Sequence, residues 1–204
     1  MSDYANAIDE FWRWFEVHRV DFDILADTEA PFWDIALGEL KRLDEHLWFE
    51  LSGQDDDPRE FVITAEGHAK VFALVDEMVA RAPKIPGWEF VPLKPAMGFD
   101  FETTYEGISF DPRTMWFLPL LSASRPQNLG LRIGVPGYQP ENKRETDNAV
   151  LVILDTALGE RVAALDVHYV EVVALPAAPE ADGYIELPEL GRYIEWRKRK
   201  LSGT

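Results

Sequence analysis

The spacing of apolar residues changes along the chain, and this change limits the folds that the chain can adopt. Residues 4–25 predict a helix, because Tyr4, Ile8, Phe11 and Phe15 recur on one helical face. A second helix is expected after the segment 27–31, which ends in a proline suited to a first helical turn. The buried stripe of this second helix is predicted to consist of Phe32, Ala36, Leu40, Leu43 and Leu47. The two helices are expected to pair as an antiparallel hairpin.

Strand signals follow the two helices. Residues 47–51 and 60–64 flank the polar turn 52–58 and predict a hairpin with an acidic tip. A third helix is expected at about 67–81, and residues 88–93 predict a strand whose Pro92 favours a sheet edge. Beyond residue 94, the sequence predicts strands at 115–121, 129–135, 149–154 and 169–175, helices at about 156–165 and 188–200, and irregular loops at 94–113 and 136–148.

These elements predict an α+β fold, in which an N-terminal helical hairpin packs on a mixed or antiparallel sheet with further helices. The chain of 204 residues fits one domain, or two lobes at about 1–95 and 96–204 that share one core. The order strand, helix, strand in 60–93 recurs in 149–175 and raises the alternative of a structural duplication. The predicted core contains Phe11, Phe15, Leu40, Leu43, Phe61, Ile63, Val75, Phe90, Leu120, Val152 and Val172.

The charge is strongly negative and unevenly distributed. The net charge is −17, and residues 1–60 hold 17 acidic against 5 basic side chains, a local net charge of −12. Such a balance disfavours nucleic acid and anionic membranes as partners. It is compatible with a simple role in solubility, and it also predicts an acidic helical face that binds a basic protein partner.

Composition also limits the chemistry and the location. The chain has no cysteine, which excludes disulfides, thiolate zinc sites, iron–sulfur clusters and cysteine nucleophiles. Its N-terminus has no basic and apolar signal-peptide pattern, and its longest apolar run falls short of the ~20 residues of a membrane helix. We therefore expect a cytoplasmic protein, with no cofactor and no metal site.

A search for catalytic patterns finds no P-loop, nucleophile elbow, zinc-protease helix or calcium loop. Asp166 and His168 are two residues apart and would share a strand face as an acid–base or metal pair, but a polar strand entrance explains them as well. Residues 55–57 can be a cation site or a solvated turn, and Asp100 with Glu102 a glycosidase-like pair. No catalytic residue is assigned, and whether the chain is an enzyme stays open.

Two aromatic or basic clusters have both a structural and a functional interpretation. Residues 11–15 hold four aromatic side chains that can cage a cation, but helical spacing places Phe11 and Phe15 in the core. The basic run 197–200 resembles a nucleic-acid patch, but it also ends a predicted helix, where cations complement the helix dipole. We expect core packing for the first cluster and a dipole effect for the second.

If the chain binds a small anionic ligand, the long loops 94–113 and 136–148 are the expected place. Residues 92–147 hold 6 basic and 7 acidic side chains, a nearly neutral balance in an acidic chain. Basic groups there can receive a carboxylate or phosphate, or can simply form surface ion pairs. The candidate cleft consists of Trp88, Lys94, Arg113, Trp116, Arg125, Tyr138, Lys143 and Arg144.

The segment Phe11-Trp12-Arg13-Trp14-Phe15-Glu16 resembles the N-terminal FWxWFE signature of a bacterial family of uncharacterised proteins. The segments 59–67, 82–90, 158–160 and 187–190 continue the resemblance in order along most of the chain. The family has no known activity, so the resemblance implies no catalytic residues. Related chains are found beside domains similar to a ribonuclease E inhibitor, which implies at most a protein-binding regulatory role.

Overall fold

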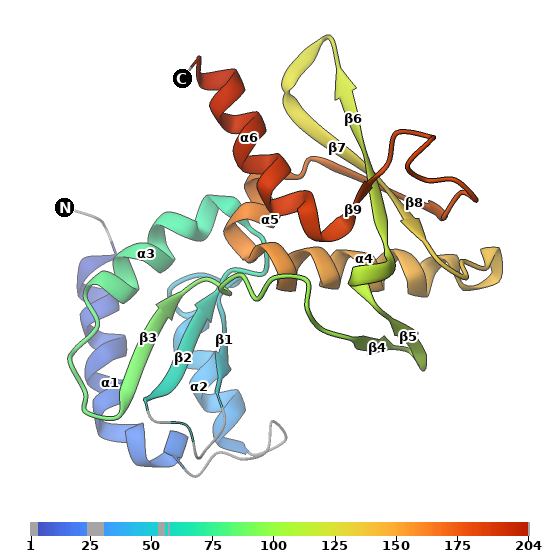
Figure 1. Cartoon of the computed structure of the whole chain (residues 1–204). Helices are drawn as coiled ribbons and strands as arrows, with labels where there is room; N and C mark the ends of the chain where they lie inside the picture. Colours follow the sequence, from blue (N-terminus) through green and yellow to red (C-terminus); the bar gives the residue numbers. More distant parts are fainter. Residues whose placement is uncertain (1–3, 24–30, 53–55, 57, 204) are drawn as a thin grey trace. The chain divides into compact units, whose positions relative to one another are not determined.

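The computed structural model describes residues 4–23, 31–52, 56 and 58–203. The chain divides into two compact units, residues 1–95 and 96–204 (Figure 1). The N-terminal unit contains α1 (Ala5–Asp23), α2 (Pro31–Lys41), β1 (Trp48–Leu51), β2 (Arg59–Thr64), the 3-10 turn η1 (Ala69–Val71), α3 (Phe72–Ala80) and β3 (Trp88–Pro92). The predicted helix start at 27–30 and the turn residues Asp55 and Asp57 lie outside the described residues.

The N-terminal unit is built on a three-stranded mixed sheet with the order β1-β2-β3. Strand β2 pairs antiparallel with β1 and parallel with β3, and Phe61 lies beside Phe90 in the parallel register. The Phe15 ring of α1 lies 5.1 Å from Phe61 and 5.2 Å from Phe90, and Trp33 of α2 lies 4.4 Å from Phe49. The helical hairpin therefore packs on one face of the sheet, as Figure 1 shows.

Helix α3 packs on the same face as α1. The indole nitrogen of Trp12 donates a hydrogen bond of 2.8 Å to the carbonyl oxygen of Met78 in α3, and both residues are buried. The Trp12 ring also lies 4.6 Å from Phe90. Since all three helices lie on one face, the opposite face keeps the alternate side chains of the strands, among them Glu50, Glu60 and Glu89.

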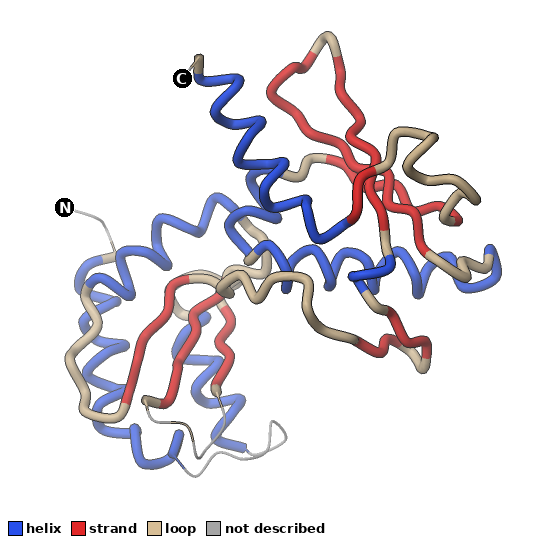
Figure 2. The backbone as a smooth tube through the Cα atoms, in the orientation of Figure 1, coloured by secondary structure: helices blue, strands red, loops and turns tan. Residues whose placement is uncertain are grey.

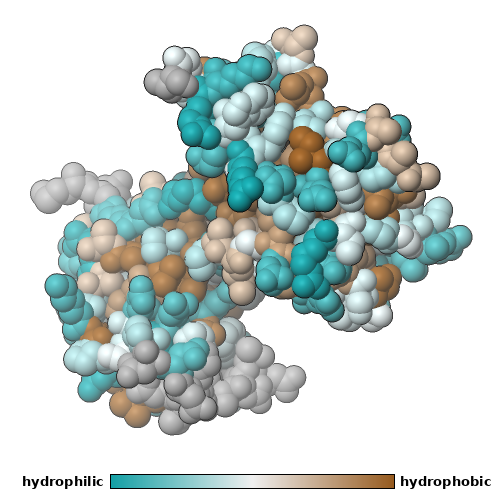
Figure 3. All heavy atoms as spheres, viewed as in Figure 1, coloured by the Kyte–Doolittle hydropathy of each residue, from teal (hydrophilic) through white to brown (hydrophobic). Residues whose placement is uncertain are grey.

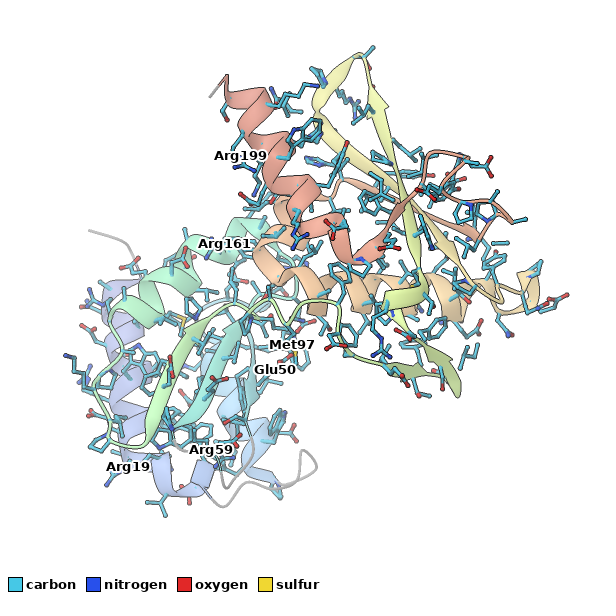
Figure 4. All side chains as sticks on the ribbon, viewed as in Figure 1. Arg19, Glu50, Arg59, Met97, Arg161 and Arg199 are labelled. Carbon is cyan, nitrogen blue, oxygen red and sulfur yellow. The ribbon has the colours of Figure 1, made fainter. Side chains whose placement is uncertain are left out.

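Arg59 is a buried cation in the first position of β2. Its Nη1 donates a hydrogen bond to the carbonyl oxygen of Phe22 in the last turn of α1. Its guanidinium carbon lies 5.4 Å from the centre of the Trp88 ring, a cation–π contact. Arg59, labelled in Figure 4, thus joins the end of α1 to the sheet through two different kinds of contact.

The C-terminal unit is built on a second, four-stranded sheet, and its two longest helices are α4 and α6 (Figure 2). Its elements are β4 (Thr103–Tyr105), β5 (Ile108–Phe110), η2 (Pro112–Thr114), β6 (Trp116–Ser122), β7 (Arg125–Val135), η3 (Pro140–Asn142), α4 (Lys143–Leu158), α5 (Glu160–Asp166), β8 (Tyr169–Ala174), β9 (Ile185–Glu186), η4 (Leu187–Glu189) and α6 (Leu190–Ser202).

Strand β7 lies in the interior of this second sheet, whose strand order is β8-β7-β6-β9. It pairs antiparallel with β6 and parallel with β8, and β9 pairs antiparallel with β6. The buried side of β7, including Leu131 and Ile133, belongs to one core with Ile153 of α4 and Ile194 of α6. Strands β4 and β5 form a separate two-stranded hairpin.

The α+β class predicted from the sequence is confirmed, but the strand predicted at 149–154 is wrong. This segment lies inside α4, whose buried residues recur with helical rather than alternating spacing. Val152, expected in the core, is 47% exposed on the outer side of the helix. The predicted loop 136–148 is wrong in its second half, which contains η3 and the first turns of α4. The buried residues of α4 are Thr146, Ala149, Val150, Ile153, Leu154, Ala157 and Leu158.

Two other regions differ from expectation in detail. The predicted helix at 156–165 is the end of α4 followed by α5, with Gly159 at a φ of 77° between them. The segment 94–113, expected to be irregular, contains the β4–β5 hairpin and η2. Of the predicted core, Phe90 and Leu120 are only half-buried, because Phe90 lies on an edge strand and Leu120 near the tip of the β6–β7 hairpin.

The two sheets share a local topology. In each sheet, two antiparallel strands are followed by one or two helices, and then by a third strand that runs parallel to the second. The order is β1-β2-α3-β3 in the N-terminal unit and β6-β7-α4-α5-β8 in the C-terminal unit. The strand equivalent to 60–64 is therefore β7 and not the segment 149–154 that the sequence pattern indicated. Among the described residues, no helix is both long and apolar enough to cross a membrane.

We predict that Phe15→Ala lowers the free energy of unfolding by roughly 3–5 kcal/mol, because a fully buried ring is removed. Urea unfolding followed by tryptophan fluorescence measures the change. Val17→Ala on the same helix is the control, since Val17 is 77% exposed and its truncation should cost less than about 0.5 kcal/mol. Equal effects of the two substitutions would contradict the packing of α1 described above.

We predict that Arg59→Lys destabilises the chain by about 1–3 kcal/mol, because an ammonium group cannot reach the Phe22 carbonyl and stack on Trp88 together. Arg42→Lys is the control, since Arg42 is 69% exposed and its ion pair with Glu39 contributes little. The same unfolding experiment compares the two, and a stability of Arg59→Lys equal to that of Arg42→Lys would rule out the proposed bridge.

Candidate interaction groove in the C-terminal unit

Two adjoining cavities lie where β7 and β8 begin, and both are lined by His168. One, of about 270 Å³, lies among β7, the end of α5 and α6. The other, of about 600 Å³, follows the β6–β7 hairpin. The alternation of side chains along β7 places the first cavity on the α6 side of the sheet with Leu129, and the second on the opposite side, where Gly130 faces Leu120 and Tyr169. The two cavities meet at His168 on the edge of the sheet, and we call them together the His168 groove. Its lining residues are Leu120, Leu121, Ser122, Ser124, Arg125, Gln127, Asn128, Leu129, Gly130, Leu165, Asp166, His168, Tyr169, Ile194, Arg197, Lys198, Leu201 and Ser202.

Arg197 of α6 lines the groove and is held by main-chain oxygens. Its guanidinium donates to the carbonyl oxygens of Pro126 at 2.5 Å, Asn128 at 3.1 Å and Gln127 at 3.2 Å. These acceptors are neutral, so the three bonds fix the side chain without cancelling its positive charge. The contacts also tie α6 to the beginning of β7.

Lys198 and Asp166 form an ion pair across the groove, with 2.6 Å between Nζ and Oδ2. Partial burial is the largest single effect on Lys198 and lowers its pKa, but the hydrogen bonds and charges of Asp166 and Glu195 together outweigh it and raise the pKa above its usual value. The carboxylate of Asp166 is thus paired with a lysine, and the contacts of the His168 imidazole are with the main chain of Leu129 and Asp166. The acid–base alternative for Asp166 and His168 gains no support from this geometry.

Apolar side chains lie exposed along the same groove. Leu121 is 67% exposed on the β6–β7 hairpin, and Tyr169 is 57% exposed at the start of β8. Leu165 of α5 and Leu201 of α6 are also exposed. Each of the two cavities therefore has one cation beside exposed apolar side chains, Arg197 with Leu165 and Leu201 in the first and Arg125 with Leu121 and Tyr169 in the second.

Helix α6 makes this region basic within an acidic protein. The helix carries Arg192, Arg197, Lys198, Arg199 and Lys200 against the single acidic residue Glu195. Figure 3 shows hydrophilic side chains gathered over α6, and Figure 4 shows Arg199 projecting from it. Lys200 also lies 5.0 Å from the exposed Trp196 ring. Complementing the helix dipole, the role expected for the basic run, is compatible with this placement.

The structure does not bring the sequence-predicted cleft residues into one described pocket. Trp88 and Lys94 belong to the N-terminal unit, where Trp88 packs 5.3 Å from the Phe15 ring and Lys94 lies 3.6 Å from Glu66. Arg125 lies at the beginning of β7 and lines the His168 groove. The remaining members of the set, Arg113, Trp116, Tyr138, Lys143 and Arg144, lie around the opposite ends of β6 and β7.

Three of the predicted cations are paired with acids, namely Lys94 with Glu66 as described above, Arg113 and Lys143. Arg113 contacts Glu102 at 2.7 Å, Asp111 at 2.8 Å and Asp100 at 3.3 Å. These carboxylates, Asp111 foremost, raise the pKa of Arg113, and Arg113 in turn lowers the pKa of Asp111. Lys143 pairs with Asp147 at 2.5 Å. The interpretation as surface ion pairs therefore explains Arg113 and Lys143, and Asp100 and Glu102 are partners of Arg113.

The described part of α1 carries charges of both signs, with more acidic than basic residues. The exposed acids Glu10 and Glu16 alternate there with Arg13 and Arg19, and Asp9 pairs with Arg81 at 2.6 Å. On the sheet face opposite the helices, Glu60 and Glu89 lie side by side, and this face also carries Glu50 and the buried Val62 and Thr64. The aromatic residues Phe11, Trp12 and Phe15 are buried, which confirms the core-packing interpretation of that cluster.

Sequence reasoning missed most of the His168 groove. The basic run 197–200 was a signal, but the contact of Arg197 with the beginning of β7 and the cavity between the β6–β7 hairpin and the start of β8 depend on contacts between distant segments. No family model, curated protein or solved structure matches this chain.

Proposed function

We propose that this chain is a non-catalytic interaction protein of the cytoplasm, and that its His168 groove binds an acidic, partly apolar segment of a partner protein. The observation that carries the proposal is the bonding of Arg197, whose guanidinium is fixed by three neutral carbonyls beside exposed Leu165 and Leu201. The guanidinium is therefore held in one position, and its positive charge remains available to bind an anionic ligand.

The charge of the rest of the chain favours a local and selective contact. A net charge of −17 repels acidic chains at long range, so an acidic segment is retained only where the local potential is positive. Exposed leucines and Tyr169 supply the apolar burial that an interface requires besides charge. Repulsion elsewhere on the surface would disfavour acidic chains that do not fit the groove.

We predict that Arg125→Gln and Leu121→Ser each weaken binding of an acidic, leucine-rich peptide by about tenfold, because one removes charge and the other apolar contact. Fluorescence anisotropy with a library of short peptides, in which Asp/Leu-rich and Lys-rich members are equally represented, measures the affinity. The control is Arg192→Gln, which removes the same charge from an exposed residue of α6 that pairs with Glu189 and does not line the groove.

Three outcomes would overturn the groove proposal. One is equal affinity of the Arg125→Gln and Arg192→Gln variants for the selected peptide. Another is selection of Lys-rich peptides in place of acidic ones by the wild-type chain. The third is tighter binding of a single-stranded RNA oligonucleotide, which would assign the basic helix to nucleic acid and contradict the expectation drawn from net charge.

A second candidate is the binding of a basic protein partner to the glutamate face of the N-terminal sheet. Glu60 and Glu89 are direct neighbours in the parallel register of β2 and β3, and like charges in such positions cost stability. Within the described part of the chain, neither carboxylate takes part in an ion pair. A basic partner that covers this face would relieve the repulsion.

We predict that the double substitution Glu60→Gln, Glu89→Gln weakens binding of a lysine-rich peptide, and that the wild-type affinity falls as salt rises, since screening weakens charge attraction. The control is Glu45→Gln together with Glu141→Gln, which removes the same charge from exposed residues outside this face. Equal loss in both double variants would show that only net charge matters and would remove the glutamate face as a site.

A further inference from the structure

The outer edge of β3, which is the side of this strand away from β2, has backbone groups that pair with no other strand. Strand β3 lies at one end of the sheet order β1-β2-β3, as Pro92 predicted. Its flanking residues Gly87 and Leu93 form backbone hydrogen bonds of 2.8 Å with β2, so the odd-numbered residues between them also face β2. The backbone groups of Trp88 and Phe90 therefore point away from the sheet.

Three of these outward-pointing groups are open to a new partner. The N–H of Trp88 donates to the carbonyl oxygen of Ile85 at 3.1 Å, and Pro92 has no N–H to offer. Within the described ranges, the N–H and the carbonyl of Phe90 and the carbonyl of Trp88 form no backbone hydrogen bond. A single residue of an antiparallel strand can exchange both bonds with Phe90, and the next residue but one can donate to Trp88.

A cavity of about 470 Å³ lies beside this edge. It is lined by residues 88–90 of β3, by Val79 of α3 and by residues 82–86, which connect α3 to β3. Figure 1 shows this connection passing along the outer side of β3. The charged residues of the lining are Lys84 and Glu89, and the others are apolar. The cavity therefore offers an apolar environment to a side chain beside the edge.

The other face of the sheet is acidic at the same position of β3. Glu89 lies on the face opposite the helices, as the neighbour of Glu60 in the register of β2 and β3. Like charges in such positions cost stability, and opposite charges across strands stabilise a sheet. In an antiparallel added strand, the residue that follows the one opposite Phe90 lies opposite Glu89. A lysine or arginine at that position would therefore attract Glu89.

We infer that the outer edge of β3 is a strand-addition site, at which an extended partner segment of alternating apolar and basic residues pairs antiparallel with residues 88–90. The apolar residues share the face of Phe90 and the cavity, and the basic residues lie beside Glu89. In this mode of recognition, backbone bonds give affinity and side-chain pockets give specificity. The choice of a basic partner rests on the second candidate function above, whereas the pairing rests on the open backbone groups and the cavity.

The test is binding of a short capped peptide of alternating valine and lysine to the full chain, measured by isothermal calorimetry. A peptide of the same composition, with its valines and lysines in separate blocks, is expected to bind at least about tenfold more weakly. It cannot place all valines on one face of a strand and all lysines on the other. An alternating valine and glutamate peptide should also bind more weakly, since it adds carboxylates beside Glu60 and Glu89.

Methylation of the peptide backbone distinguishes strand addition from other modes of binding. The valine opposite Phe90 directs its N–H to β3, and the N–H of each neighbouring lysine points to solvent. Methylation of the valine nitrogens should therefore lower the affinity at least about tenfold, and methylation of the lysine nitrogens by less than about twofold. Both changes leave the protein unaltered, so the comparison does not depend on the folding of a variant.

Substitutions in the protein test the two faces separately. Glu89→Gln should weaken binding of the valine and lysine peptide about threefold or more through charge, and Ile85→Ser should do so through the cavity. Lys84→Gln is the matched control, because it changes the other charged residue of the lining and is expected not to weaken binding. Circular dichroism of each variant should match the wild type.

Amide hydrogen exchange, followed by nuclear magnetic resonance, locates the added strand. The N–H of Phe90 is expected to exchange rapidly in the free chain and slowly at saturation with the valine and lysine peptide. The N–H groups of Glu89 and Val91 face β2 and should be protected in both states. Unchanged exchange of Phe90 at saturation would overturn the inference.

Three further results would overturn strand addition. Equal losses after methylation of the valine and the lysine nitrogens would show that the backbone is not paired. If the Glu60→Gln, Glu89→Gln double variant still weakened binding in that case, the glutamate face would stand without the edge, so the two proposals fail separately. Equal affinity for the valine and glutamate peptide would exclude a basic partner. Concentration-dependent protection of Phe90 in the free chain would assign the edge to a second copy of the chain.

Discussion

The N-terminal unit depends on the burial of the aromatic face of α1 against the central strand β2. Phe15 and Phe22 lie 4.6 Å apart, and each packs edge-on against Phe61 of β2. Trp12 extends the contact to α3 through the Met78 carbonyl, and Arg59 fixes the last turn of α1. Because this apolar surface is buried under the helices, all three helices lie on one side of the three-stranded sheet. The other side carries Glu60 and Glu89, the residues of the second proposed binding site.

In the C-terminal unit the corresponding central strand is β7. Its length determines which side chains lie near one another. An extended strand of 11 residues spans roughly 35 Å, so Arg125 at its beginning is far from the loop that follows Val135. Arg125 therefore lines the cavity of the His168 groove that includes the start of β8. The cations Lys143 and Arg144, which follow the other end of β7, cannot join it there.

Local periodicity predicted the elements that are amphipathic, and it failed where the apolar run was ambiguous. Phe11, Phe15 and Leu40 are buried as their helical spacing requires. The run from Ala149 to Leu154 contains two valines and an isoleucine, which favour a strand, but the polar residues before it begin a helix of 16 residues. Most of the groove had no local signal, because it forms only where the fold brings α6, the β6–β7 hairpin and the start of β8 together.

The first cavity of the His168 groove depends on how one cation is held. Main-chain carbonyls fix the geometry of Arg197 without neutralising its guanidinium. Arg113, by contrast, is surrounded by three carboxylates that satisfy both its hydrogen bonds and its charge. The nature of the acceptor, and not the presence of a basic residue alone, therefore distinguishes a side chain that can bind a ligand from one that only stabilises the surface.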